Sequence, residues 1–290
     1  MSLPPPPALR IARLALRVTD LERAVAFYRD TLGFAANGDC RRQDMALLSL
    51  GGRELALVSA DPAAAPYPEP RVANDPWFQH FAIAVSNMTE AYQRVRRSGA
   101  EPISRAGPQL LPPNTGAMTA YKFRDPEGHP LELSYDPHRA PAAAVAVTGP
   151  FLAIDHTALA VRDLGAALEF YTAVLGFAPS GRTLNRGPEQ DRLDGLDGAC
   201  VDIVALATAR SGLRLELLHY RSPDPAPPRD VGPGDIAATR ATIEVEDLRQ
   251  VTDALEERRR PWTATSSSGL LARDADGHWI EVTEAYSGSK

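Results

Sequence analysis

Four short segments of the chain alternate apolar and polar residues with a period of two, which is typical of strands with two different faces. They are Ile11–Val18, His80–Val85, His156–Val161 and Arg240–Val245. Each is followed by an acidic or Asn-containing turn and by a stretch whose apolar residues fall on one helical face. Because further strand-like runs come after every helix, we predict four βαβββ modules, over residues 11–60, 78–136, 154–221 and 238–286.

Two motifs recur along the chain in the same order. The segment Asp20–Phe34 (DLERAVAFYRDTLGF) matches Asp163–Phe177 (DLGAALEFYTAVLGF) at eight of fifteen positions, and Arg124–Leu133 (RDPEGHPLEL) matches Arg273–Val282 (RDADGHWIEV). Such self-similarity indicates a duplicated unit. We therefore predict two domains, 11–136 and 151–286, joined by an Ala/Pro-rich linker at 137–150 and preceded by a disordered segment at 1–10.

Composition narrows the functional classes. The 290 residues include 31 basic and 37 acidic side chains, a net charge of −6, so no basic footprint for nucleic acid is present. No apolar run reaches the roughly 18 residues of a membrane span, and two cysteines do not make a disulfide scaffold. We expect a cytoplasmic protein, monomer or homodimer, with a small-molecule substrate and with neither a nucleic-acid nor a membrane partner.

The four-module pattern, with DLxxAxxFYxxxLGF after the first strand and DxxGHxxE before the last, resembles the vicinal-oxygen-chelate superfamily. That group includes glyoxalase I, extradiol ring-cleaving dioxygenases and bleomycin resistance proteins. The resemblance implies an α+β fold in which βαβββ modules form two glyoxalase-like domains, as paired, incompletely closed barrels. It also implies a divalent metal on the concave face, where it chelates neighbouring oxygens of the substrate.

In that superfamily the metal ligands come from the first and last strands of a module. Counting through the repeat places Arg13, His80, His156 and Arg240 at the first-strand positions, and Ala56, Glu132, Glu216 and Glu281 at the last-strand positions. We predict a metal site of His80, Glu132, His156 and Glu216, suited to Ni, Zn, Co, Fe or Mn. We interpret the two arginines as losses of metal binding, with Arg13 or Arg240 pairing with Glu281.

Two pairings of the modules remain open. If neighbours in the chain pair, each cavity holds at most one histidine. If the second and third modules pair across the linker, one cavity collects all four ligands, and the ligand distribution favours this arrangement. Weaker candidates for contact with the substrate are Tyr121, in the strand before the DPEG turn, and Gln190 and Arg192, in a polar loop over Asn185–Arg192.

The ligand set is most similar to that of glyoxalase I. This similarity implies a metal-dependent lyase or isomerase that acts through a metal-chelated enediolate, with Glu132 or Glu216 as the catalytic group that moves a proton between adjacent carbons. An Fe(II) extradiol dioxygenase and a metal-free small-molecule binding or resistance protein are the alternatives.

Overall fold

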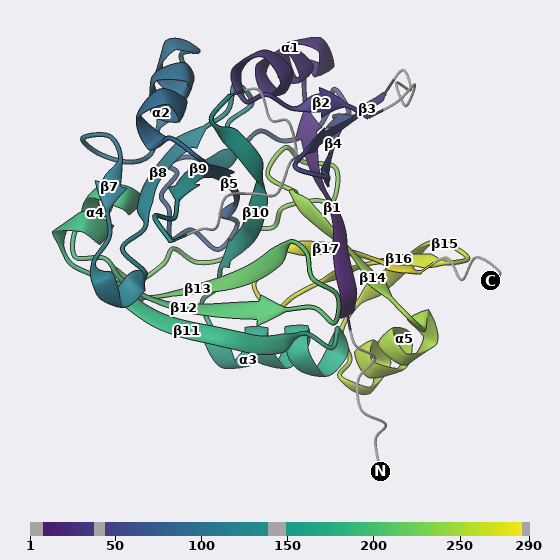
Figure 1. Cartoon of the computed structure of the whole chain (residues 1–290). Helices are drawn as coiled ribbons and strands as arrows, with labels where there is room; N and C mark the ends of the chain where they lie inside the picture. The colour runs from purple at the N-terminus through teal and green to yellow at the C-terminus, as the bar shows by residue number, and fades with distance from the viewer. Residues whose placement is uncertain (1–7, 38–43, 139–148, 286–290) are drawn as a thin grey trace.

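The structure is a computed structural model that describes residues 8–37, 44–138 and 149–285 (Figure 1). Of the predicted N-terminal segment 1–10, residues 1–7 lie outside the described residues, and residues 8–10 already belong to the first strand. Most of the predicted linker, residues 139–148, also lies outside them. The fold is α+β, with two mixed sheets that do not close into barrels.

The elements follow the predicted modules. The first half contains β1 (Ala8–Val18), α1 (Leu21–Ala26), β2 (Ala35–Ala36), β3 (Met45–Leu50), β4 (Arg53–Ser59), β5 (Gln79–Val85), α2 (Met88–Arg97), β6 (Glu101–Pro102), β7 (Gln109–Leu110), β8 (Thr119–Arg124) and β9 (Pro130–Tyr135). The second half contains β10 (Phe151–Ala160), α3 (Leu164–Glu169), β11 (Ala178–Arg186), α4 (Pro188–Asp194), β12 (Cys200–Ala207), β13 (Arg214–Ser222), β14 (Arg240–Val245), α5 (Leu248–Glu257), β15 (Trp262–Ser266), β16 (Gly269–Arg273) and β17 (Trp279–Glu284).

Each sheet combines strands from both halves of the chain. One sheet has the order β15-β16-β17-β14-β1-β4-β3-β2, and the other has the order β11-β12-β13-β10-β5-β9-β8-β6. The second module therefore pairs with the third, across the linker, and the first pairs with the fourth. At the two seams, β5 runs antiparallel to β10 and β1 runs antiparallel to β14.

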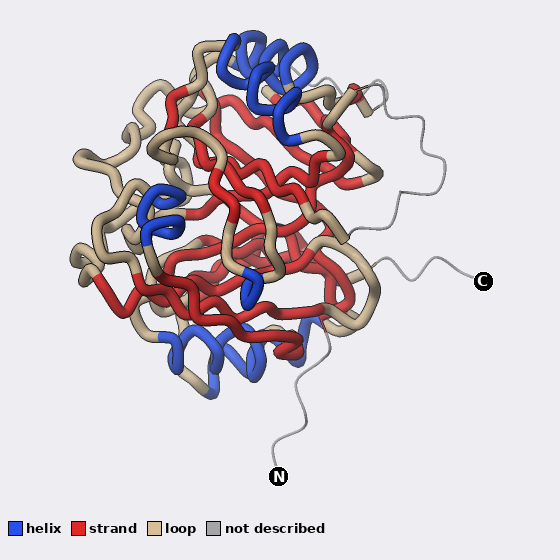
Figure 2. The backbone as a smooth tube through the Cα atoms, turned by 60° about the vertical axis from the view of Figure 1, so that its left-hand side comes forward, coloured by secondary structure: helices blue, strands red, loops and turns tan. Residues whose placement is uncertain are grey.

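Helices from the same half of the chain lie on the same side of the molecule, even though their modules contribute to different sheets. In Figure 1, α1 and α2 of the first half lie at the top, and α3 and α5 of the second half lie at the bottom. Figure 2 shows the strands between these two groups of helices. None of the helices in the described part of the chain is long and apolar enough to cross a bilayer. The apolar faces of α1, α2, α3 and α5 pack into a core built from both sheets.

The Asp or Asn residue in the turn before each of these helices caps its N-terminus. The side chains of Asp20, Asn87, Asp163 and Asp247 accept hydrogen bonds from backbone N–H groups in the first turns of α1, α2, α3 and α5. Past the ends of the first and third helices, Gly33 and Gly176 adopt φ of 73° and 74°, a left-handed conformation that glycine takes without steric cost. The repeated LGF sequence is thus a helix stop.

The two repeated motifs contact each other. The hydroxyl of Tyr28 donates to Asp125 Oδ2 at 2.8 Å, and the hydroxyl of Tyr171 donates to Asp274 Oδ2 at 3.1 Å. The other oxygen of each aspartate accepts backbone N–H groups of its own turn. The FY motif of one module therefore anchors the aspartate turn of the next, which ties together modules whose strands lie in different sheets.

The segment Asn185–Arg192, predicted as a polar loop, is regular structure. Its first residues complete β11, which runs to Arg186, and its last residues belong to α4, which starts at Pro188. Proline suits the first turn of a helix because its missing N–H has no intrahelical acceptor there. The prediction of a loop was wrong because β11 is largely exposed, and an exposed strand lacks the buried apolar face that would have marked it as a strand in the sequence.

Candidate metal centre

The seam between β5 and β10 brings the two predicted histidines together. In this antiparallel pair, His80 lies opposite Ala158 and His156 lies opposite Ala82. The flanking parallel strands supply the carboxylates, because Glu132 of β9 lies beside Ala82 and Glu216 of β13 lies beside Ala158. Small alanine side chains between the larger ones leave space on this face for an ion and a ligand.

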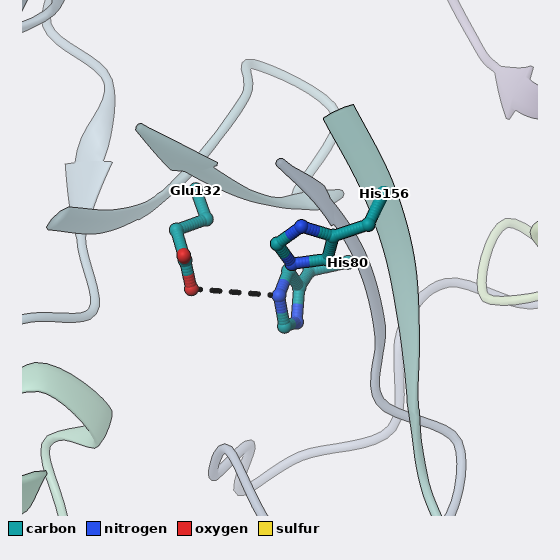
Figure 3. A group of neighbouring side chains, drawn as sticks. All are labelled: His80, Glu132 and His156. Atoms are coloured by element: carbon teal, nitrogen blue, oxygen red, sulfur yellow. Dashed lines mark ion pairs between the residues drawn. The ribbon is translucent and has the colours of Figure 1, made fainter. Parts of the chain in front are cut away.

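Figure 3 shows His80, Glu132 and His156 converging from β5, β9 and β10. Each offers one ligand atom, and these three atoms lie within 4.8 Å of one another. His80 Nε2 is 3.5 Å from Glu132 Oε2, and His156 Nε2 is 3.6 Å from Glu216 Oε2. The structure thus contains a buried His-Glu-His group that could hold a metal ion, with a second carboxylate beside it.

The state of the two imidazoles fits a metal site. Both ring nitrogens of His80 are buried and have no hydrogen-bond partner, a costly arrangement that coordination through one of them would relieve in part. His156 Nδ1 lies 3.0 Å from Asp155 Oδ2, and such a contact orients a metal-binding imidazole and leaves Nε2 free to coordinate. Imidazole and carboxylate donors together suit Zn, Ni, Co, Fe or Mn.

Electrostatics distinguish the two histidines. Burial lowers the pKa of His80 well below its ordinary value, and the positive charges of Lys122 and His156 lower it further. Burial also lowers the pKa of His156, but the carboxylates of Glu216, Asp155 and Glu132 outweigh this and raise it to about 9. Without an ion, the imidazole of His80 is therefore neutral at pH 7, and that of His156 is the positively charged imidazolium.

A buried lysine next to this group was missed at the sequence level. Lys122 Nζ lies 2.7 Å from Asp194 Oδ1 and 3.8 Å from Glu132 Oε2. Asp194 also accepts hydrogen bonds from Gln190 Nε2 at 2.6 Å and from the Tyr220 hydroxyl at 3.0 Å. A signal was present, since the chain has two lysines and this one lies between apolar residues of a strand.

Of the three weaker candidates for contact with the substrate, one lines the cavity and two do not. Alternation along β8 puts Lys122 on the cavity side and Tyr121 on the opposite side, where its ring contacts Tyr92 of α2 at a centroid distance of 4.8 Å. Arg192 is also absent from the cavity lining, because its Nε donates to Gln109 Oε1 at 2.6 Å. Gln190 does line the cavity, and its Oε1 is buried without a partner.

A cavity of about 440 Å³ opens over the group, a size typical of small-molecule sites. Its walls mix apolar side chains such as Leu193 and Leu218 with polar ones such as Asn185 and Gln190. The side-chain oxygens of Asn185 and Gln190 are buried and unpartnered, so they are available to hydrogen-bond donors of a ligand.

The equivalent positions of the other sheet do not form a metal group. Arg13 lies opposite Thr242 and Arg240 lies opposite Ala15, in the same register as the two histidines. The predicted pairing of Arg13 or Arg240 with Glu281 is wrong, because no ion pair joins them in the described structure. Instead Glu281 Oε2 accepts a hydrogen bond from the hydroxyl of Thr242 at 2.6 Å.

Comparison with known proteins agrees with the fold and the module pattern. The sequence profile of the Glyoxalase/Bleomycin resistance protein/Dioxygenase superfamily matches residues 10–133 and 153–282. The chain belongs to this superfamily. Two mutants of glyoxalase I from Zea mays share the fold of the whole chain, with TM-scores of 0.68 and 0.66 at 19% and 18% identity. These matches cover 95% and 96% of this chain and 92% and 94% of the maize chains.

Two further proteins are similar to the chain, one in the sequence of about half of it and one in the fold of nearly all of it. A lactoylglutathione lyase of Salmonella typhimurium is 28% identical over 130 residues, which is 43% of this chain and 91% of that protein. A putative dioxygenase from Bacillus subtilis has a TM-score of 0.59 at 12% identity and covers 98% of this chain and 87% of that one. Because identities are this low, the structural likenesses establish the shared fold and leave the reaction to the site itself.

Proposed function

We propose that the chain is a metal-dependent lyase or isomerase of the glyoxalase I type, acting on a small oxygenated substrate. The observation that carries the proposal is the buried group of His80, Glu132 and His156, in which both ring nitrogens of His80 are unpartnered, beneath a polar-lined cavity. A divalent ion held by His80, His156 and Glu132, with Glu216 beside it, would supply Lewis-acid stabilisation of negative charge on neighbouring substrate oxygens.

The two carboxylates have different freedom to move a proton. Glu132 lies between His80 and Lys122, at 3.5 and 3.8 Å, and is held by both. Glu216 is 3.6 Å from His156, and its side chain is 18% exposed on the cavity wall. We assign to Glu216 the removal of a proton from a carbon next to a carbonyl, and its return to the adjacent carbon.

Lys122 contributes a fixed positive charge. Its ammonium is buried, and Asp194 and Glu132 hold it beside the candidate ligands. A preorganised charge in a site with little water stabilises negative charge that develops on a substrate oxygen when the adjacent carbon loses its proton. The chain would thus bind the substrate oxygens near His80 and Lys122 and place the reacting carbons toward Glu216.

An Fe(II) extradiol dioxygenase is the second candidate, because two histidines and one carboxylate are the ligand set of many non-haem iron oxygenases. The deciding experiment is to measure bound metal in the purified chain and then to assay two reactions with that metal. Formation of lactoylglutathione from glutathione and methylglyoxal supports the proposal, and oxygen uptake with catechols supports the dioxygenase. Failure to bind any divalent ion after reconstitution would contradict both and leave a binding protein.

A further inference from the structure

A second cavity, of about 150 Å³, lies over the seam between β1 and β14. Strand register makes it the counterpart of the candidate metal site. Arg13 has the position of His156, and Arg240 has the position of His80. Ala56 of β4 lies beside Ala15 of β1, just as Glu216 of β13 lies beside Ala158 of β10, so Ala56 has the position of Glu216. The duplication has therefore kept the hollow while changing its chemistry.

Positive charge dominates this cavity. Three arginines line it, Arg13 and Arg17 from one face of β1 and Arg240 from β14, against the one carboxylate of Glu281. Glu281 is engaged by the hydroxyl of Thr242 at 2.6 Å and forms no ion pair with these arginines in the described structure. Three guanidinium groups share a small space without a matching number of anions.

The guanidinium groups are also poorly satisfied. The Nε of Arg240 is buried without a hydrogen-bond partner, and its Nη2 donates to the carbonyl oxygen of Pro233. Arg17 makes a long hydrogen bond of 3.5 Å to the carbonyl oxygen of Ser59. Within the described residues the side chain of Arg13 makes neither a hydrogen bond nor an ion pair. Burial and the charge of Arg17 lower the pKa of Arg240, and the opposing charge of Glu281 does not compensate for them.

We propose that the cavity between Arg13, Arg17 and Arg240 is an anion-binding site for a compact oxyanion, a phosphate or carboxylate group. Planar guanidinium forks bind such groups with paired N–H···O hydrogen bonds, and a bound oxyanion would supply the acceptors that Arg13 and Arg240 lack. At about 150 Å³ the cavity is smaller than the roughly 300–1,000 Å³ of drug-sized ligand sites, so it suits a small anionic group. The site is independent of any metal in the other cavity.

Inorganic phosphate tests the proposal directly. Calorimetric titration of the metal-stripped chain with phosphate, with acetate, and with chloride at equal ionic strength distinguishes the two oxyanion chemistries from simple screening. We expect one phosphate or acetate to bind per chain, and the tighter of the two identifies the preferred class. If neither binds more tightly than chloride, the proposal is wrong.

Variants locate the site. Arg13→Gln and Arg240→Gln should each weaken oxyanion binding about tenfold or more, which corresponds to roughly 1.4 kcal/mol. Arg10→Gln, on the same strand but paired with Glu244 at the surface, is the matched control and should leave binding unchanged. Lys122→Met controls for an anion in the other cavity. Because Arg13 has no hydrogen bond to lose, Arg13→Gln carries the test if Arg240→Gln does not fold. Full-affinity binding by Arg13→Gln, or its loss in Lys122→Met alone, would overturn the proposal.

Discussion

The two seams of the molecule share one backbone plan and differ in charge. At the β5–β10 seam, the equivalent positions hold His80, His156, Glu132 and Glu216, beneath a cavity of about 440 Å³. At the β1–β14 seam, they hold Arg240, Arg13, Glu281 and Ala56, beneath a cavity of about 150 Å³. The register of the strands is the same, so the fold provides the hollow and a few side chains decide what can occupy it.

The residues next to the equivalent glutamates also differ between the two seams. In the histidine seam Ala82 lies beside Glu132 and leaves its carboxylate free to face His80, whereas in the arginine seam Thr242 lies beside Glu281 and hydrogen-bonds to it. Lys122, opposite Glu132, is replaced by Leu271, opposite Glu281. These differences give Glu281 a hydroxyl donor, but they leave the buried Nε of Arg240 without an acceptor.

Removal of either histidine should have the largest effect. Both imidazoles belong to one candidate group, so His80→Ala and His156→Ala should each abolish stoichiometric metal binding. Arg240→Ala, at the position equivalent to His80, is the matched control and should leave metal content unchanged. Elemental analysis of the purified proteins measures the result. A full-affinity metal in either histidine variant would show that the two do not share an ion.

Removal of the proton-carrying carboxylate comes next. Glu216→Gln keeps the size of the side chain and removes its basicity, so kcat should fall about 10²–10⁴-fold, the range for loss of a general base. Metal content should persist, because His80, Glu132 and His156 remain. Glu281→Gln, in the other cavity, should leave kcat unchanged. If Glu216→Gln keeps its activity while Glu132→Gln loses it, the roles of the two carboxylates are reversed.

The arginine seam should accept a metal when given the residues of the histidine seam. The variant Arg13→His, Ala56→Glu, Thr242→Ala and Arg240→His copies the ligand positions and the small residue beside one of them. We expect one additional divalent ion per chain, measured by elemental analysis and by titration. A chain that folds and still binds no additional ion would mean that strand register alone does not make the site, and that Lys122 or the larger cavity is also required.

Metal affinity should depend on pH because His156 must lose its proton to coordinate. Its pKa is about 9 in the metal-free chain, so at pH 7 binding displaces close to one proton. Apparent affinity should therefore rise about tenfold per pH unit between pH 7 and 9 and then level off. Asp155→Asn removes a carboxylate that raises this pKa, so its affinity should level off at a lower pH. Affinity that is constant from pH 7 to 9 would contradict the assignment of His156 as a ligand.

The repeat in the sequence was enough to predict the modules and the strands that form the seams, whereas the pairing of the modules stayed open and the ligand distribution only favoured the one observed. Period-two alternation places His80 and His156 on one face, and the duplication locates their partners without knowledge of the fold. What the sequence left open depended on long-range pairing. Lys122 and Asp194 are 72 residues apart. They meet because α4, which follows the edge strand β11, packs against β8 near the other edge of the same sheet. Tyr121 and Lys122 are neighbours, and the face of β8 that each occupies follows from that pairing.

The smallest effect concerns the motif that both halves share. Tyr28→Phe and Tyr171→Phe each remove one hydrogen bond to a buried aspartate whose other oxygen stays bound to its own turn. Each should lower the free energy of unfolding by about 1–3 kcal/mol, because a charged acceptor loses one donor. Urea unfolding measures the loss, and the shorter bond of Tyr28, 2.8 against 3.1 Å, predicts that its loss is at least as large.

The same contact recurs in both halves, and each half contributes one strand to each seam. Neither variant should therefore change metal content or oxyanion binding. This outcome would show that two features shared by the repeats act independently. One is the tyrosine–aspartate contact that holds consecutive modules together, and the other is the cavity at each seam, whose lining differs between the two. If either tyrosine variant lost its metal while still folded, the anchor would also position the candidate ligands. Tyr28 and Tyr171 would then have to be counted among the residues that shape the site, since the turns they hold precede the strands that carry Glu132 and Glu281.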